Sequence, residues 1–336
     1  MSFLLRITMV SAVLLFLSGC SAIYKPTAWI VYDYTEDHAI PYTLTSDDPG
    51  MVCGLSEALA PGLLSFSTVA YTPDKAAITM YMMAGSCAEE RALEEALTYL
   101  RSLKAQNIDE AKDARIREKR QFAVAAQRQY AAYRHMVDQF IEPGDACPKL
   151  KKKDEVYWVM GNLAGVQAVM SDMRAQNMVN VPKDIAMKAV RGMQCVDNDR
   201  WWGLPQAAQA SIAIMMPDSS AGAADPWVEM EQASSKASTS GVRMAHAIEV
   251  MVADSTGHEE RLKNAIRRHA DAMKTTPSLP EFRLMDLVSS RQILAVSDRM
   301  WTEATGSRTP IEGLGTFWDD VVDQGPMFDI DDLLGD

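Results

Sequence analysis

Apolar residues return at helical spacing along most of this chain. From Met51 onward, leucine, methionine, alanine and valine recur every three or four positions, as on one face of an α-helix. The pattern predicts an all-α fold, with helices over residues 51–71, 74–87, 88–104, 108–140, 154–176, 182–195, 205–216, 226–237, 241–253, 259–274 and 280–302. Abundant methionine (22 residues) and an aromatic content of only 7% also favour helices over a sandwich or barrel.

The loops between these helices are short, and proline marks several helix starts. Asp225-Pro226 combines a carboxylate that accepts free amide hydrogens with a proline suited to the first helical position. Short helices of alternating direction predict helical-hairpin repeats, similar to tetratricopeptide repeats, over residues 51–302. The flanking segments lack a helical period. We expect a tether over residues 20–50 and an acidic, solvated tail over residues 303–336.

The first 19 residues have the features of an export signal. Arg6 precedes an apolar run over residues 7–17, which is shorter than the roughly 20 residues that span a bilayer. The sequence LSGC at residues 17–20 resembles a bacterial lipobox, in which the cysteine sulfur carries a diacylglycerol and becomes the mature N-terminus. We therefore expect a lipid anchor at Cys20. Ser21 and Ala22 after it carry no aspartate retention signal, which predicts the periplasmic face of the outer membrane, with exposure at the cell surface as the alternative. An ordinary signal peptide with a chance cysteine is the alternative.

The composition excludes several classes of function. A net charge of −12 argues against nucleic-acid binding and against adsorption to anionic lipid, so membrane attachment depends on the lipid anchor. The chain has no phosphate-binding glycine loop, no G-x-S-x-G elbow and no H-E-x-x-H motif. His258 and His269 border or belong to a charged segment, which predicts a surface position, whereas His246 in an apolar helix predicts a core histidine. We expect no enzymatic activity, no cofactor and no metal site.

Four cysteines follow Cys20, and an even number in an exported chain predicts two disulfides. If residues 51–71 and 74–87 form an antiparallel hairpin, Cys53 and Cys87 lie at its open end, at similar distances from the turn. Cys147 precedes one predicted helix and Cys195 ends the next, which runs back alongside it. We therefore predict the pairs Cys53–Cys87 and Cys147–Cys195.

The clearest candidate for a ligand site is the start of the helix over residues 154–176. Tyr157, Trp158 and Asn162 lie there, and the last two are four residues apart, so they share one helical face. An indole and an amide on one face can offer a stacking surface and a hydrogen bond to a small molecule. Core packing between repeat helices is the simpler explanation of the same residues.

The order of several segments resembles one known family. The lipobox comes first, followed by a helical hairpin and a long helix. The later landmarks are QRQYAAY, DEVYWVMGNLAG, DPWVEMEQASS, SGVRMAHAIEVMVA and PEFRLMDLVSSRQILAVSDRMW. Over residues 51–301 the chain resembles the TatT component of tripartite ATP-independent (TRAP) transport systems.

The resemblance implies an all-α, lipid-anchored periplasmic protein that forms a homotrimer with a central channel. It implies association with a periplasmic solute-binding protein, the P component, and passage of a hydrophobic or carboxylated ligand such as a small organic acid. Tyr157, Trp158 and Asn162 are the ligand-site candidates that carry over. A general outer-membrane lipoprotein scaffold for envelope assembly is the alternative function.

Overall fold

A computed structural model of the chain describes residues 23–144, 146–216 and 225–320. These residues are largely helical and contain no β-strand, as the apolar period predicts. Among them, no helix combines the length and apolar character needed to cross a membrane. The predicted signal peptide over residues 1–19, the predicted lipidation at Cys20, and residues 321–336 of the tail lie outside the described residues.

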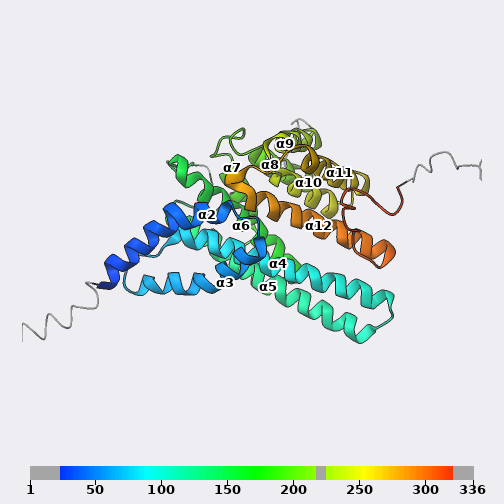
Figure 1. Ribbon diagram of the computed structural model, residues 1–336, viewed down its shortest axis with the longest axis horizontal. Helices are drawn as coiled ribbons and strands as arrows, with labels where there is room; N and C mark the ends of the chain where they lie inside the picture. Colours follow the sequence, from blue (N-terminus) through cyan, green and yellow to red (C-terminus); the bar gives the residue numbers. More distant parts are fainter. Residues whose placement is uncertain (1–22, 145, 217–224, 321–336) are drawn as a thin grey trace, which may run out of the picture.

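The helices follow one another along the chain with short connections (Figure 1). They are α2 (Ile40–Leu44), α3 (Pro49–Ser65), α4 (Asp74–Lys104), α5 (Ile108–Gln139), α6 (Glu155–Arg174), α7 (Asp184–Met193), α8 (Leu204–Met215), α9 (Pro226–Ser240), α10 (Met244–Ser255), α11 (Glu259–Thr275) and α12 (Arg283–Thr305). Side-chain caps begin several of them. Asp225 accepts the amide hydrogen of Trp227 at the start of α9, and Asn107 accepts that of Glu110 at the start of α5.

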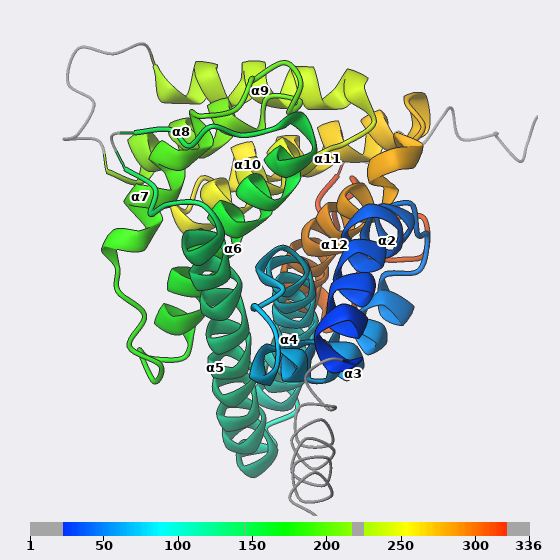
Figure 2. The same ribbon diagram turned by 90° about the vertical axis from the view of Figure 1, so that its left-hand side faces the viewer.

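Sequential neighbours pack side by side and build the molecule in two tiers. The long helices α4 and α5 pack along each other, and α6 packs against α5. The shorter helices α8 to α11 lie on the other side of α12, which crosses between them and α4 (Figures 1 and 2). The main apolar core contains Trp158, Met136 and Leu204, each almost fully buried.

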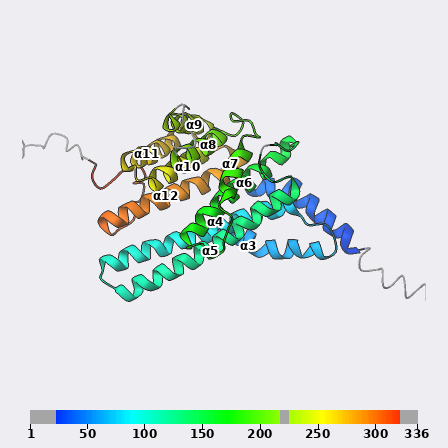
Figure 3. The ribbon, with the colours of Figure 1, turned by 180° about the vertical axis from the view of Figure 1, so that it is seen from behind.

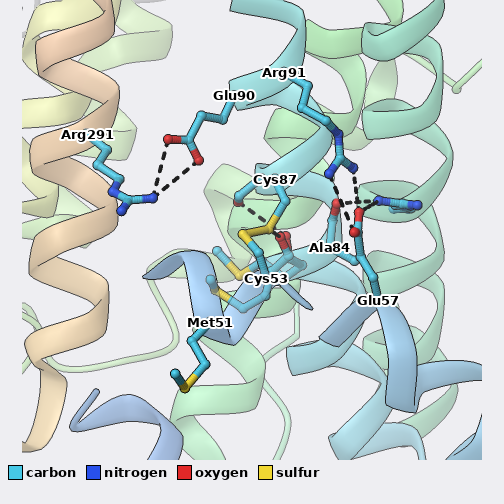
Figure 4. The surroundings of a disulfide bond; sticks show 12 residues. Met51, Cys53, Glu57, Ala84, Cys87, Glu90, Arg91 and Arg291 are labelled. Atoms are coloured by element: carbon cyan, nitrogen blue, oxygen red, sulfur yellow. Dashed lines mark hydrogen bonds and ion pairs between the residues drawn. A yellow bond between two sulfur atoms is a disulfide. The ribbon is translucent and has the colours of Figure 1, made fainter. Parts of the chain in front are cut away.

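Both predicted disulfides are confirmed. Cys53 in α3 bonds to Cys87 in α4 with a Cα–Cα distance of 5.9 Å, and Cys147 bonds to Cys195 at 5.4 Å. Glu57 forms ion pairs with both Arg91 and Arg128. Figure 4 shows the Cys53–Cys87 bond beside the pair of Glu57 and Arg91. This bond fixes α3 to the middle of α4.

The prediction of a tether without helices is wrong for residues 23–44. They form one continuous helical segment, called here the N-terminal helix: an α-helix over residues 23–34, a π-helix over Thr35–Ala39, and α2. Tyr32 is fully buried, and its ring centroid lies 5.0 Å from that of Tyr71 and 6.3 Å from that of Phe66. Burial against these distant residues stabilises a helix that the local sequence does not predict.

Two further boundaries differ from the sequence prediction. Residues 74–104 form one helix rather than two. Cys87 and Ala88, where the predicted helices meet, are both buried inside this continuous helix. The predicted solvated tail packs on the body over residues 306–320. Phe317 is buried against α11, where Lys263 lies 5.6 Å from its ring centroid. Ion pairs of Asp319 with Lys263 and of Asp320 with Arg267 add to this aromatic contact, so the acidic segment is held by both apolar burial and charge.

Candidate functional site

Helices α4, α6, α7, α8, α10 and α12 line an apolar cavity of about 350 Å³. Half of the chain's 22 methionines line it: Met82, Met83, Met160, Met170, Met173, Met193, Met215, Met216, Met244, Met251 and Met285. Methionine is unbranched and polarisable, so a wall of methionines adapts to apolar molecules of different shape. We call this space the methionine cavity.

The lining of the methionine cavity contains very few polar groups. Lys183, just before α7, is its only ionisable side chain and is exposed to solvent. No ion pair to Lys183 occurs within the described ranges. The side-chain oxygen Oε1 of Gln167 in α6 is buried without a hydrogen-bond partner among the described residues. An apolar space with one cation at its edge is suited to an apolar ligand with an anionic end, and the Gln167 oxygen can accept a hydrogen bond from a donor on that ligand.

A second pocket, of about 670 Å³, lies where the N-terminal helix meets the start of α6 and the turn before α8. We call it the charged pocket. Its aromatic lining is Tyr157, Trp201, Trp202 and Phe282. Three of the four cations in its lining are paired already, and the fourth is Lys152. Lys75 contacts Glu36 at 3.2 Å and Asp154 at 3.1 Å, and Arg200 contacts Glu155. Because most of its charges neutralise one another, this pocket offers little free charge to an ion.

The structure separates the three ligand-site residues predicted from sequence. Tyr157 lines the charged pocket and donates its hydroxyl hydrogen to the Glu36 carbonyl oxygen at 3.4 Å, and burial raises its pKa. Trp158 is fully buried and donates its indole N–H to the Gly192 carbonyl oxygen at 2.8 Å. Asn162 is also fully buried, and its amide donates to the Trp158 carbonyl oxygen at 2.8 Å. Trp158 and Asn162 line neither of these two cavities. The Trp158 hydrogen bond joins α6 to α7, and the Asn162 hydrogen bond lies within α6.

No family model, curated protein or solved structure matches the chain. Its function is therefore argued from the cavity, the surface and the sequence pattern. The methionine cavity was not predicted from the sequence. Its one signal in the sequence is the high methionine content of 22 residues, which by itself is typical of helices.

The histidine positions correct one prediction and confirm two. His258 is exposed and His246 is fully buried, as predicted, but His269 is also fully buried, although its segment is rich in charge. The Nδ1 atoms of His246 and His269 lie 3.2 Å apart, and His246 Nε2 lies 2.8 Å from the Ser234 carbonyl oxygen. Burial is the main cause that lowers the pKa of His246 to about 4 and of His269 to about 3. The two rings are therefore neutral at pH 7 and link α10 to α11.

One group among the described residues has three potential metal ligands close together. Asp74, His135 and Asp138 each offer an atom within 4.8 Å of the others. His135 Nδ1 already lies 2.7 Å from Asp74 Oδ1, and Asp138 is exposed. The contact between His135 and Asp74 explains this geometry without an ion.

Proposed function

We propose that the protein is a non-enzymatic lipoprotein of the bacterial envelope that binds an apolar, carboxylated ligand. The methionine cavity is the observation that carries this proposal. Its volume of about 350 Å³ lies within the roughly 300–1,000 Å³ range of small-molecule sites, and its walls are almost entirely apolar. The carboxylate would lie at Lys183 and the apolar part among the methionines.

The same proposal gives the protein a place in a transport system. The lipobox at Cys20 and the ordered motifs over residues 51–301 support an accessory role like that of the TatT component of TRAP systems. In this role the protein is lipid-anchored at the outer membrane, forms a trimer of tetratricopeptide-like repeats, and receives its ligand from a periplasmic solute-binding protein. The paired short helices around the methionine cavity suit such a task, because repeat surfaces bind partners without changing their own packing.

Anilinonaphthalene sulfonate, an apolar aromatic anion, tests the cavity directly. We expect it to bind with an affinity that falls about fivefold in Lys183→Gln, since a partly exposed ion pair contributes roughly 1 kcal/mol. Ala186→Phe should abolish binding, because Ala186 lines the cavity and a phenyl ring there occupies it. Fluorescence titration measures both effects.

The matched control is Ala213→Phe on α8, because Ala213 is similarly half-buried but is not part of the cavity lining. Circular dichroism establishes that each variant keeps its helices. If Ala186→Phe and Ala213→Phe bind the probe as the parent protein does, the methionine cavity is not a ligand site.

Crosslinking in cells tests the transport role. We expect the mature protein to be trimeric by light scattering and to retain a periplasmic solute-binding protein after crosslinking and purification. A lipoprotein of similar abundance from the same membrane serves as the control for chance capture. A monomer that retains envelope-assembly proteins instead would favour the general scaffold.

A further inference from the structure

One side of the N-terminal helix is apolar and uncovered by the rest of the described structure. Ile23, Ile30 and Tyr34 are 66%, 70% and 63% exposed. They lie seven and four residues apart, so they share one side of the helix. Ala28 and Tyr32, both fully buried, face the body on the opposite side. We call the three exposed residues the outer stripe.

The surroundings of the outer stripe are also apolar. Tyr24 and Trp29, each 49% exposed, flank it. Over residues 23–34 only Lys25 and Asp33 are charged, so this segment does not share the strong negative charge of the whole chain. All residues from 23 to 27 are exposed, and the helix projects from one end of the molecule (Figures 1 and 3).

The predicted lipid anchor lies at this projecting end. Ile23 follows Cys20 by three residues, and each residue spans at most about 3.6 Å, so the helix begins within about 11 Å of the Cys20 Cα atom. Any surface this close to an anchor faces the bilayer at a high effective concentration. Tryptophan and tyrosine favour the membrane interface, where the ring is in an apolar layer and its polar atom is hydrated.

We propose that the outer stripe lies on the bilayer surface and orients the whole protein against the membrane. This inference rests on the lipid anchor of the proposed function. A second copy of the chain is a poorer occupant, since a stable interface buries about 800 Å² on each partner. Three residues on one narrow helix face provide far less. An interfacial helix, in contrast, needs only a shallow apolar face beside an anchor.

A fluorophore sensitive to solvent polarity, attached to Ile30→Cys in the mature, lipidated protein, tests this placement. The matched control carries the same label at Ile311→Cys, because Ile311 is 95% exposed and lies on the C-terminal segment. The proteins are reconstituted in vesicles of phosphatidylethanolamine and phosphatidylglycerol that contain a nitroxide-labelled lipid. We expect a blue shift and at least twofold quenching at position 30 and neither change at position 311.

Each other outcome has a definite meaning. Emission typical of water at position 30 on vesicle-bound protein overturns the inference and leaves the anchor in place. A blue shift at position 30 in the absence of vesicles, if it increases with protein concentration, overturns the inference in favour of contact with a second copy. If mass spectrometry finds no acyl chains on Cys20, the lipid anchor of the proposed function fails. Vesicles are then added to the unlipidated protein. If the emission spectrum of the label at position 30 does not change, the proposed contact between the outer stripe and the bilayer fails as well.

Discussion

Asp286→Asn is expected to lower the free energy of unfolding by about 3 to 5 kcal/mol, the cost of leaving a buried charge without its partner. Asp286 in α12 and Arg243 before α10 are each only 1% exposed, and their side chains form an ion pair. The carboxylate also accepts the Arg243 backbone N–H at 2.8 Å and the Ser278 hydroxyl at 2.5 Å. The amide keeps the shape of the side chain but removes the charge that neutralises Arg243.

Urea unfolding of the full chain, followed by circular dichroism, measures this loss. Asp271→Asn is the matched control, because Asp271 pairs with Lys274 at 3.3 Å with both side chains more than 70% exposed. Exposed pairs of this kind contribute at most about 1 kcal/mol. Equal effects of the two substitutions would show that the buried pair does not stabilise the packing of α10 against α12.

Acidification from pH 7.5 to pH 5 is expected to remove about 4 kcal/mol of stability through His246 and His269. Both histidines have a lowered pKa when folded, near 4 and 3, against about 6.5 in the unfolded chain. Between these values the unfolded state binds protons that the folded state does not, so stability falls as pH falls below about 6.5. At pH 5 each histidine contributes about 2 kcal/mol to this loss.

The contribution of the two histidines is measured by the slope of the free energy of unfolding against pH, rather than by its value at one pH. We expect the double variant His246→Gln and His269→Gln to lose most of the slope between pH 6.5 and pH 5, even if it is less stable at pH 7.5. His258→Gln should keep the parent slope, because His258 is exposed. The three proteins have the same carboxylates, so a double variant with the parent slope would contradict the assignment.

The sequence predicts the helices well where the signals are local. Asp225 and Pro226 begin α9 as predicted, because a cap and a proline act within one turn. The disulfide between Cys53 and Cys87 follows from hairpin geometry, since two residues at similar distances from a turn meet across antiparallel helices.

The parts that the sequence did not predict depend on distant contacts. The N-terminal helix is stabilised by Tyr32 against Phe66 and Tyr71, which no local period reveals. The charged segment over residues 258–269 predicts a surface position for His269, but the helix turns the ring of this residue inward toward His246. The methionine cavity joins helices from α4 to α12, so its residues become neighbours only in the folded chain.

The bond between α3 and α4 also determines how the protein responds to mechanical load. An anchor in a membrane transmits any pull on the body through the N-terminus. Tension would travel along the N-terminal helix to Cys53 and pass there through the disulfide into Cys87. Residues 54–86, which lie between the two cysteines, would bear no force. Under oxidising conditions a pull would peel away the segment before Cys53 first, and the disulfide would shield the part of α4 before Cys87, including Met82 and Met83 of the methionine cavity.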